Sequence, residues 1–393
     1  MKMTQPGVAH FVRISSQLNL SFILNQITNH LNYSPVVIVY KKQNRTIRNG
    51  LDLLAEMKIP VLFLCDEKDL LNRIYYFLFR KITWIQKRRI LKFITANQTN
   101  LLHFHFGNDA GMFLPVIYKS GFPSVVSFYG NDCTGFPKKY FGLGHYWLKL
   151  RVFPKADRFL AMSLDMKKQL MILGCPEKKI TVHYFGADIT RFQSYTRSYS
   201  SSLEFTQLLI IANLIEKKGH LFLFEVLKRL SEKGTVGFNL IVVGSGFLED
   251  QLKAFVRENG LTDHIRFIPR IDYLSEEFVR LYYDSDIFIH PSVTDSWGEK
   301  EGIPGVLVEA MATGLPVIST RHAGIPSIIE NGKTGLLVDE WNIPELLHAL
   351  ESLISDPSKR EELGRAGQNF VVHELNIANK EKELETLYSI IHG

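Results

Sequence analysis

Residues 286–320 read DIFIHPSVTDSWGEKEGIPGVLVEAMATGLPVIST. The stretch opens with a short apolar run, DIFIH, and closes with another, PVIST, while GVLVEAMA between them has the composition of a buried helix. Short β-branched runs that alternate with helices are typical of parallel sheets built from βαβ units. These residues are therefore expected to form a strand, a loop, a helix and a second strand of an α/β domain.

The same alternation extends along the whole chain. The earlier apolar runs are AHFVRI, PVVIVY, PVLFLC, LLHFHF, PSVVSFY, RFLAM, QLLIIAN, FNLIVVG and IRFIP. A chain of 393 residues is too long for one ordinary core, and a polar, Ser- and Tyr-rich stretch near residues 190–206 interrupts the pattern. We predict two doubly wound, Rossmann-like domains at 1–195 and 196–372, with residues 373–393 as a helix that packs back on the first domain.

Composition indicates a globular protein of the cytoplasm. Apolar residues make up 46% of the chain, yet the sequence has neither an apolar run long enough to span a bilayer nor a leading signal segment. The three cysteines are widely spaced and form no C-x-x-C pair, so we expect buried thiols rather than disulfides or a zinc site.

Charge is divided unevenly between the two predicted domains. Residues 1–195 carry 27 Lys and Arg against 11 Asp and Glu, whereas residues 196–393 carry 19 against 29. An anionic membrane surface, an acidic or phosphate-linked acceptor and nucleic acid would each suit the basic half. Nucleic acid is disfavoured, because the chain has no zinc-finger spacing, RNP-like strand or basic heptads.

The basic residues are densest at 73–92, where they alternate with aromatic residues and no acidic residue occurs. A basic amphipathic helix of this kind can lie on an anionic bilayer. An ordinary domain helix with a solvated charged face explains the same pattern, so both interpretations stay open. The basic residues are Arg73, Arg80, Lys81, Lys87, Arg88, Arg89 and Lys92, interleaved with Tyr75, Tyr76, Phe77, Phe79 and Trp84.

The loop before the helix of the opening stretch has the features of an anion site. Pro304 suits the first turn of a helix, Glu301 precedes it, and Glu309 lies within the helix. Such a helix start offers N–H groups without intrahelical partners, and its glycines let a ligand approach closely. Helix N-termini favour diphosphates, while two carboxylates suit the hydroxyls of a sugar. We therefore predict a nucleotide-sugar site, with backbone contacts from Gly302, Ile303, Gly305 and Val306.

At this point the sequence resembles the family 4 retaining glycosyltransferases of the GT-B fold. The family's two glutamates separated by seven residues stand here in EGIPGVLVEAMATGLPV. The resemblance continues through STRHAGIPSIIENGKTGLLV, NLIEKKG, VVGSG and HYFGADITRF, and so covers the second domain. In the first domain, SFILNQITNHL and HFHFG are similar to exopolysaccharide glycosyltransferases of the colanic acid and amylovoran type. The GT-B resemblance implies that the two sheets face each other across a cleft.

The resemblance implies a role for each matching residue of the second domain. Glu301 is expected to contact hydroxyls of the transferred sugar, Glu309 the ribose, and Lys218 the donor phosphates. Lys218 would stabilise the negative charge that grows on the leaving diphosphate. The family often has arginine where this chain has Asn213. The other donor-side positions are Gly244, in a strand-to-helix turn, and Ile271, beside the nucleotide base.

The first domain departs from the family pattern. Its segment VVSFYGNDCTGF is similar to a strand that ends in His-Gly-x-Asp, but Tyr129 occupies the histidine position and can still donate a hydrogen bond. Asn131 and Asp132 follow on the acceptor side. We expect His105 to lie at the cleft, at the carboxyl end of a strand, and His103 to belong to the core.

The predicted reaction needs neither a metal nor another cofactor. As the resemblance implies, transfer would retain the anomeric configuration, and the leaving phosphate would help to deprotonate the acceptor hydroxyl. Asp284 and Asp286 mimic a metal-binding Asp-x-Asp pair, but they fall between a helix and a strand, so we expect one of them to be a cap. The expected acceptor is a saccharide or a polyprenyl-diphosphate-linked saccharide of exopolysaccharide or cell-envelope synthesis. Attachment to the inner face of the cytoplasmic membrane is a further hypothesis.

Two other functions stay open. The same architecture serves nucleotide-sugar epimerases, and Asn213 and Tyr129 are compatible with a degenerate sugar-binding subunit that has lost catalysis. The intact EGIPGVLVEAMA segment disfavours the epimerase. Glu301, Glu309 and Lys218 together disfavour the degenerate subunit.

Overall fold

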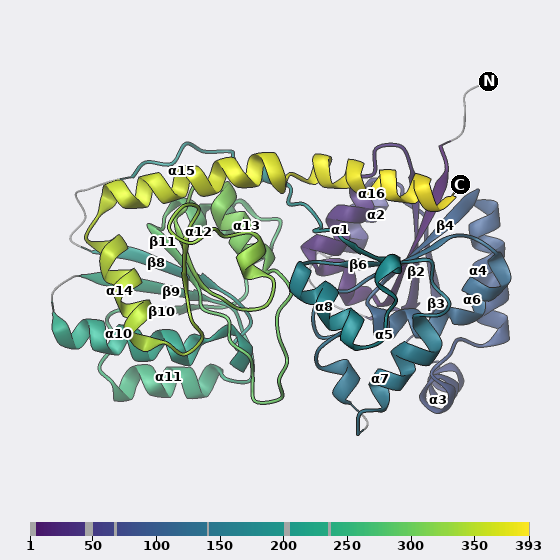
Figure 1. Ribbon diagram of the computed structural model, residues 1–393, viewed down its shortest axis with the longest axis horizontal. Coiled ribbons are helices and arrows are strands. Elements are labelled where there is room, and N and C mark those ends of the chain that lie inside the picture. Colours follow the sequence, from purple (N-terminus) through teal and green to yellow (C-terminus); the bar gives the residue numbers. More distant parts are fainter. Residues whose placement is uncertain are drawn as a thin grey trace. The chain divides into compact units, whose positions relative to one another are not determined.

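The computed structural model describes residues 5–43, 50–66, 69–139, 141–199, 205–234 and 237–392. The chain divides into two compact units, one made of Met1–Gly186 with Ile377–Gly393 and the other of Ala187–Asn376. Each unit is a parallel sheet covered by helices (Figure 1). The predicted boundaries were at 195 and 372, and the stretch 200–204 of the predicted linker lies outside the described residues.

The first unit contains a seven-stranded parallel sheet with the order β3-β2-β1-β4-β5-β6-β7. The order reverses between β1 and β4, where the register pairs His10 with His103. Such a reversal is the switch point at which doubly wound domains bind ligands. The strands are β1 (Gly7–Ile14), β2 (Ser34–Lys41), β3 (Val61–Cys65), β4 (Thr99–His105), β5 (Ser124–Ser127), β6 (Arg158–Ala161) and β7 (Ile180–Val182).

The basic segment 73–92 is not one helix. Arg80 adopts a left-handed conformation (φ 52°) that ends α3, and Thr83 caps the start of α4 through its side chain. The expectation of a single amphipathic helix was therefore wrong, and the side chain of Arg73 lies outside the described part. The helices of this unit are α1 (Ser21–Thr28), α2 (Gly50–Glu56), α3 (Leu70–Phe79), α4 (Trp84–Ala96), α5 (Gly107–Ala110), α6 (Leu114–Ser120), α7 (Leu143–Trp147), α8 (Leu164–Ile172) and α16 (Ile377–His392).

The C-terminal helix α16 belongs to the first unit, as the sequence analysis predicted. The carboxylate of Glu385 accepts the backbone N–H groups of Leu31 and Asn32 at 2.7 and 3.0 Å. Tyr388 is fully buried against β-strand residues such as Leu101. Polar and apolar contacts together thus hold the end of the chain on the first sheet.

The second unit contains a six-stranded parallel sheet with the order β10-β9-β8-β11-β12-β13. Its switch point lies between β8 and β11, the strand that opens the stretch DIFIHPS. The strands are β8 (Thr206–Ile211), β9 (Phe238–Val243), β10 (Ile265–Ile268), β11 (Ile287–His290), β12 (Val317–Thr320) and β13 (Leu336–Val338).

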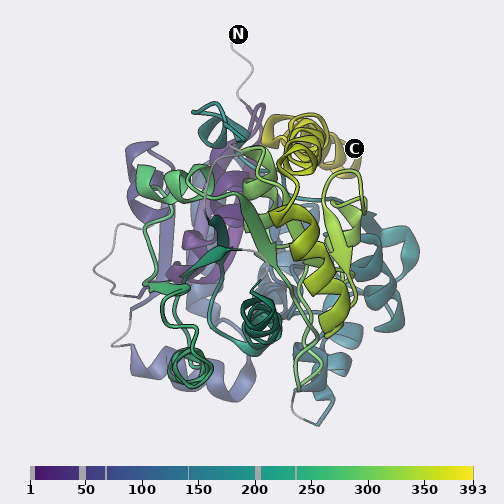
Figure 2. The same cartoon turned by 90° about the vertical axis from the view of Figure 1, so that its left-hand side faces the viewer.

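Helices cover both faces of the second sheet. Figure 1 shows α10 and α11 on one side and α12 and α13 on the other, and Figure 2 views α10 and α11 nearly along their axes. Ile287 and Ile289 face the α10 side, whereas Phe288 between them packs on Tyr282 of α12, as alternation along a strand requires. The helices are α9 (Ile189–Phe192), α10 (His220–Lys233), α11 (Glu249–Glu258), α12 (Glu276–Tyr283), α13 (Gly305–Ala312), α14 (Ile343–Ile354) and α15 (Pro357–Glu374).

None of the helices in the described ranges combines the length and the apolar content that crossing a bilayer requires. The three cysteines are free and buried, as expected.

Candidate active site

The residues predicted to bind the donor follow four neighbouring strands of the second sheet. Asn213 and Lys218 come after β8, Gly244 directly after β9, Ile271 after β10, and Glu301 after β11. The carboxyl ends of parallel strands meet at one edge of a sheet, so these loops share that edge on both sides of the switch point.

Lys218 and Glu301 form an ion pair at this edge. The Nζ atom of Lys218 lies 2.6 Å from Oε1 of Glu301, and both side chains are largely removed from solvent. Burial alone would raise the pKa of Glu301, but the positive charges of Lys218 and Lys217 and the nearby His290 ring lower it to about 2. Glu301 is therefore ionised at neutral pH and offers only acceptor oxygens to a ligand.

His322 and Glu340 hold the backbone of Glu301. The Glu301 N–H donates to Nε2 of His322 at 3.0 Å, and Nδ1 of His322 donates to Glu340 at 2.6 Å. Glu340 also accepts the N–H of Thr294 at 2.7 Å, so it joins the two ends of the loop that follows β11. This pair could not be predicted from the sequence, because Glu301 meets His322 only through the neighbouring positions of β11 and β12.

The loop that carries Lys218 is fixed to the loop after β11. Gly219 has a positive φ of 69°, and a Cβ atom there would lie 1.9 Å from the carbonyl oxygen of Pro291. Only glycine fits this contact. Val293 N–H donates to the Lys217 carbonyl at 2.9 Å, and Glu216 accepts both the N–H and the hydroxyl of Ser296. Lys218 is thereby positioned by backbone as well as by its partner.

Glu309 is buried one helical turn inside α13. Its Oε2 atom accepts the Tyr282 hydroxyl at 2.7 Å. Burial raises the pKa of Glu309 to about 7, although hydrogen bonds from Tyr282 and Tyr273 and the charge of Arg191 oppose the shift. Glu309 therefore titrates close to neutral pH, unlike Glu301.

Helix α13 begins one residue later than predicted. Pro304 has extended backbone (ψ 121°) and precedes the helix, so Gly305 and Val306 occupy the first turn. Their N–H groups have no intrahelical acceptor and remain suited to an anion. Gly302 and Ile303 are buried in the preceding loop.

The turn at Gly244 is dictated by packing. Its φ is 149°, and a Cβ atom would lie 1.9 Å from the carbonyl oxygen of Ala212. Glycine is required here by backbone contact between the loops after β8 and β9, with or without a ligand.

In the first unit, Tyr129 lies just beyond β5 and its hydroxyl is 2.7 Å from Nδ1 of His105. The expectation that His105 lies at the cleft is not met, because its ring is fully buried. His103 lies in the core, as predicted. Asp132 is also buried and accepts the N–H groups of Gly107, Tyr129 and Gly130, each at 3.0 Å, so it joins the loops after β4 and β5.

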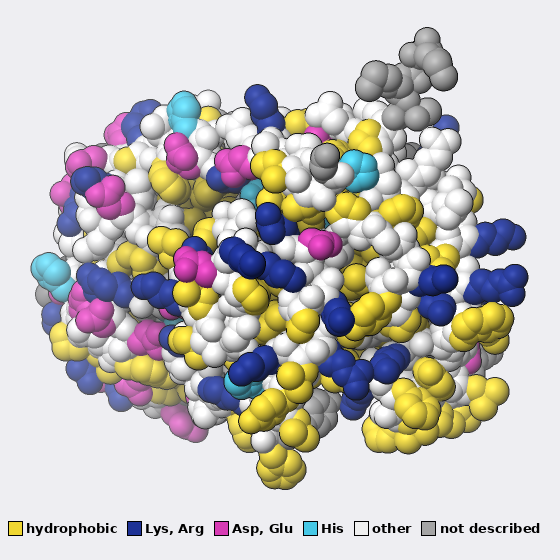
Figure 3. All heavy atoms as spheres, turned by 45° about the vertical axis from the view of Figure 1, so that its right-hand side comes forward, with side chains coloured by type: hydrophobic (Ala, Val, Ile, Leu, Met, Phe, Trp, Pro, Cys, Tyr) yellow, Lys and Arg dark blue, Asp and Glu magenta, His cyan; other side chains and the backbone are white. Residues whose placement is uncertain are grey.

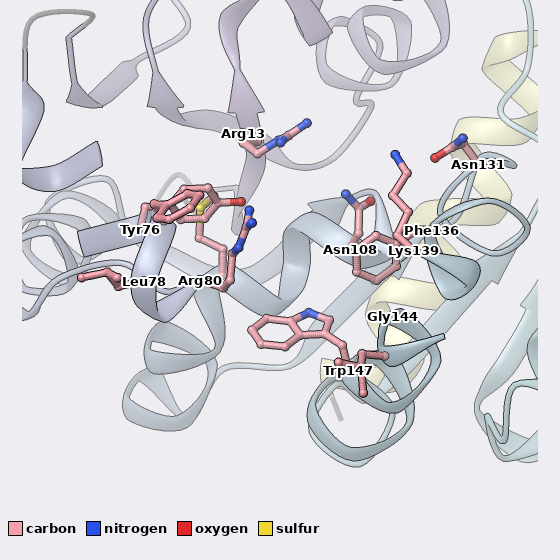
Figure 4. Close-up of a pocket in the computed structure, with 13 residues that line it drawn as sticks. Arg13, Tyr76, Leu78, Arg80, Asn108, Asn131, Phe136, Lys139, Gly144 and Trp147 are labelled. Atoms are coloured by element: carbon pink, nitrogen blue, oxygen red, sulfur yellow. The ribbon is translucent and has the colours of Figure 1, made fainter. Parts of the chain in front are cut away.

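A pocket of about 460 Å³ opens in the first unit beside its switch point. Figure 4 shows Arg13 and Arg80 on one side, Asn131 and Lys139 on the other, and Trp147 between them. Arg13 lies near the carboxyl end of β1 and pairs with Asp109 at 3.1 Å. Of the predicted acceptor-side residues, Asn131 lines this pocket, whereas the remaining lining residues were missed because they come from four separate segments. Tyr76, Phe77, Leu78, Asn108, Met112, Phe136, Leu143 and Gly144 complete the lining.

Groups with the composition of a metal site occur in the first unit rather than beside Glu301. Among the described residues they are His10 with His103 and His105, and His30 with Glu381 and Glu385. The two aspartates of the Asp-x-Asp pair, Asp284 and Asp286, occupy structural positions at the backbone. Asp286 accepts the Gln207 N–H at 2.8 Å, and Asp284 occupies the C-cap of α12.

Two family models match consecutive parts of the chain. Glycosyltransferase Family 4 matches residues 44–191, and Glycosyl transferases group 1 matches residues 191–370. The chain belongs to the family 4 glycosyltransferases. The second match spans every donor-side residue discussed above.

Curated relatives of this glycosyltransferase include two bacterial proteins. The colanic acid biosynthesis glycosyltransferase WcaL of Escherichia coli K12 is 33% identical over 250 residues, which cover 62% of this chain and 60% of the relative. The amylovoran biosynthesis glycosyltransferase AmsK of Erwinia amylovora is 35% identical over 197 residues, or 50% of this chain and 47% of the relative. The matches thus span about half to three fifths of these relatives.

Solved structures with the same fold cover nearly the whole glycosyltransferase. HepE of Anabaena, solved in complex with UDP and glucose, has a TM-score of 0.76 at 17% identity and covers 98% of this chain and 100% of its own. Sucrose-phosphate synthase of Thermosynechococcus elongatus has a TM-score of 0.74 at 15% identity and covers 98% and 99%. The fold is GT-B, as predicted.

Proposed function

We propose that this enzyme transfers a sugar from a nucleotide diphosphate sugar and that the second unit holds the donor. The Lys218–Glu301 pair carries the proposal, because it places a cation and an ionised carboxylate next to the first turn of α13. In the structure the two side chains pair with each other. When a donor binds, its diphosphate accepts hydrogen bonds from Lys218 and from the backbone N–H groups of Gly305 and Val306. The sugar hydroxyls then donate to Glu301.

The proposed chemistry needs no metal, since Lys218 and the helix start supply positive potential where the leaving diphosphate gains charge. The leaving phosphate oxygen accepts the proton of the acceptor hydroxyl, and the anomeric configuration is retained, as in the family that the sequence resembles. The anomeric coupling constant of the product tests retention. Glu309 binds the ribose, and Asn213 and Ile271 flank the nucleotide.

The experiment is a panel of UDP-, GDP- and ADP-sugars, assayed for binding and slow hydrolysis with and without EDTA. Wild type is compared with Glu301→Ala. Selective hydrolysis of one donor that survives EDTA and is lost in the variant supports the proposal. Loss of wild-type activity in EDTA contradicts metal independence, and absence of binding to every donor favours the degenerate sugar-binding subunit over a transferase.

We further propose a diphosphate-linked saccharide as the acceptor, bound in the pocket of the first unit. Its charged lining groups are Arg13, Arg80 and Lys139, which suit a diphosphate, while Trp147 and Phe136 offer flat surfaces for a sugar ring. WcaL and AmsK, whose names assign them to colanic acid and amylovoran biosynthesis, point to an exopolysaccharide pathway.

Lys139→Gln is expected to raise KM for a polyprenyl-diphosphate-linked acceptor about tenfold, because one charge-assisted contact is lost. KM for the nucleotide sugar should stay unchanged. Lys138→Gln is the matched control, since this neighbouring lysine is not part of the pocket lining. Steady-state kinetics in which both substitutions have the same effect would contradict the assignment of the pocket.

The rim of this pocket suits an anionic bilayer. Phe77 and Leu78 of α3 and Leu143 of α7 line the pocket and are exposed, and further large apolar side chains of the same helices and of α4 are exposed as well. Figure 3 shows hydrophobic and basic side chains gathered over the lower right of this face, with few acidic ones. We therefore propose that the enzyme acts in the cytoplasm, peripheral on the inner face of the membrane. Further exposed apolar residues in α3, α4, α7 and the segments flanking α7 are Leu70, Leu71, Ile74, Phe79, Trp84, Ile85, Phe141, Tyr146 and Leu150.

Removing two cations from this surface, by Lys87→Ala with Arg88→Ala, is expected to weaken binding to anionic vesicles roughly 30-fold, at about 1 kcal/mol per basic residue. The matched control is Arg229→Ala with Arg257→Ala, on α10 and α11 of the second unit. Co-sedimentation with phosphatidylglycerol vesicles measures the effect. Equal binding by the two double variants, or equal binding of wild type to zwitterionic vesicles, would contradict membrane attachment at this surface.

A further inference from the structure

Four histidines are buried together in the first unit. His10 comes from β1, His103 and His105 from β4, and His30 from the segment after α1, and all four rings are shielded from solvent. Buried polar rings require partners. The partners found here form a continuous chain rather than separate pairs.

This chain of hydrogen-bonded side chains runs from Tyr129, at the carboxyl ends of the strands, to α16. The Tyr129 hydroxyl lies 2.7 Å from Nδ1 of His105, and Nε2 of His105 lies 3.0 Å from Nδ1 of His10. On its other side, Nε2 of His10 lies 2.8 Å from Nε2 of His30. Nδ1 of His30 then contacts the carboxylate of Glu381 and lies 3.5 Å from that of Glu385.

The ring geometry fits hydrogen bonds better than a shared metal ion. The His10 and His105 centroids are 5.2 Å apart and their nitrogens 3.0 Å apart, so the difference is about the sum of two ring radii. The two rings therefore point these nitrogens at each other, and the space between the nitrogens fits a hydrogen atom but not a metal ion. His103 stacks on His105 at 4.6 Å, and its own nitrogens contact Ser127 and Tyr388.

The hydrogen bonds of this chain must all run in the same direction, so the protonation state of His30 determines which nitrogens of His10 and His105 carry hydrogen. If His30 is doubly protonated, its Nε2 donates to His10, which then carries its hydrogen on Nδ1 and donates to His105. His105 in turn donates from Nδ1 to the oxygen of Tyr129. The Tyr129 hydrogen must then point elsewhere, towards Gln26 at 3.4 Å or towards a ligand. If His30 loses one proton, every bond reverses and Tyr129 donates inwards to His105.

The surroundings of His30 favour the charged form. Burial lowers its pKa, but Glu381 and Glu385 outweigh burial and raise it to about 9. Burial lowers the pKa of His105 to about 3 and keeps His10 neutral as well. The titratable groups that face His30 are His10 from β1, Tyr33, and Glu381, Glu385 and Tyr388 from α16, with His103 behind His10.

We propose that Tyr129, His105, His10 and His30 form a proton relay that makes the Tyr129 hydroxyl a hydrogen-bond donor to a saccharide oxygen. Tyr129 suits that role because it is partly exposed just beyond the carboxyl end of β5 and is fixed by Phe22, Phe106 and Phe185. His105, His10 and His30 are positioning residues that act through Tyr129. If one proton passes outwards from His30 along the hydrogen bonds to a ligand at Tyr129, all four residues end up neutral. Every hydrogen bond between them then points in the opposite direction. The saccharide ligand rests on the proposed function, whereas the relay does not.

Imidazole ¹⁵N spectra of the ligand-free wild-type protein test the relay without any activity assay. At pH 7 the expected pattern is a doubly protonated His30 with His10 and His105 protonated on Nδ1 only. Protonation on Nε2 in His10 or His105 would overturn the relay. Stoichiometric Zn²⁺ binding that shifts these same resonances would also overturn it and establish a metal site.

The pH profile of transfer gives a second test. Wild-type transfer should fall as pH rises through about 9, where His30 loses its charge, and Glu381→Gln should move that fall towards neutral pH. Glu383→Gln, a more exposed residue of the same helix, is the matched control and should leave the profile unchanged. In Tyr129→Phe the alkaline fall should disappear. Its persistence in Tyr129→Phe, or equal shifts in the two glutamate variants, would overturn the proposal.

Discussion

Lys218→Met is expected to lower kcat/KM for sugar transfer by on the order of 10²–10³-fold. The substitution keeps much of the side-chain volume but removes the charge that faces the leaving diphosphate, and a single transition-state contact of this kind contributes about that factor. Most of the loss should fall on kcat, because the negative charge on the leaving phosphate grows in the transition state. Steady-state kinetics with the donor selected by the nucleotide-sugar panel measure the effect.

The same substitution should also destabilise the fold, and a second variant separates the two effects. Lys218→Met leaves the ionised carboxylate of Glu301 without its partner, which costs about 3 kcal/mol in a buried pair. Adding Glu301→Gln removes the uncompensated charge and should restore most of the free energy of unfolding. Transfer should remain lost in the double variant. Recovery of transfer together with stability would show that Lys218 serves folding and not catalysis.

Glu309→Gln is expected to lower kcat/KM about 10- to 100-fold, because an amide accepts ribose hydroxyls less strongly than a carboxylate. In wild type the affinity for the donor should increase as pH rises through about 7, where Glu309 ionises. The variant should lack this pH dependence. Titration of the donor between pH 5.5 and 8.5 measures both expectations, and a variant that keeps the wild-type pH dependence would contradict them.

The stability of the wild-type fold should fall as pH rises, whereas its affinity for the donor should increase. The pKa of Glu309 is raised in the folded protein, so between about pH 4.5 and 7 the folded state holds a proton that the unfolded state releases. The free energy of unfolding therefore falls as pH rises through this range, by at most about 3 kcal/mol. Glu309→Gln should be more stable than wild type at pH 8 and similar to it at pH 4.5. Tyr282→Phe, which removes only the hydrogen bond to Glu309, is the control and should lower stability at both values.

The fold could be predicted because almost every strand is marked by its own apolar run. Strands buried on both faces need continuous apolar residues, and the helices between them need a different period, so local sequence determines the order of elements. The break between α3 and α4, in contrast, was not predicted, because local sequence does not mark it clearly. Arg80 takes a left-handed conformation without being glycine or asparagine, so no local residue preference indicates it.

The proposed donor site could be recognised from the sequence where one segment carries several of its residues. Glu301, Gly305 and Glu309 lie on a single loop and helix, and their spacing is visible in the sequence. The bond from Glu301 to His322 was not, because those residues meet only after β11 and β12 pair. The low pKa of Glu301 and the high pKa of Glu309 likewise depend on Lys218 and on burial, which spacing does not reveal.

The histidine relay depends most strongly on tertiary structure. His10 and His105 are far apart in sequence, and they meet because the sheet order places β1 beside β4 with His10 opposite His103. A histidine within an apolar strand looks like an isolated core residue until its neighbours are known. The carboxylates at its end come from α16, at the opposite end of the chain.

The most direct test of the donor site is calorimetric titration of the preferred nucleotide sugar into wild type and into the Glu301→Gln/Lys218→Met double variant. The two proteins should have similar melting temperatures, since the double variant leaves no unpaired charge. We predict that the double variant binds the nucleotide sugar at least 100-fold more weakly than wild type. Equal affinity in the two proteins would contradict the assignment of Lys218 and Glu301 to the donor.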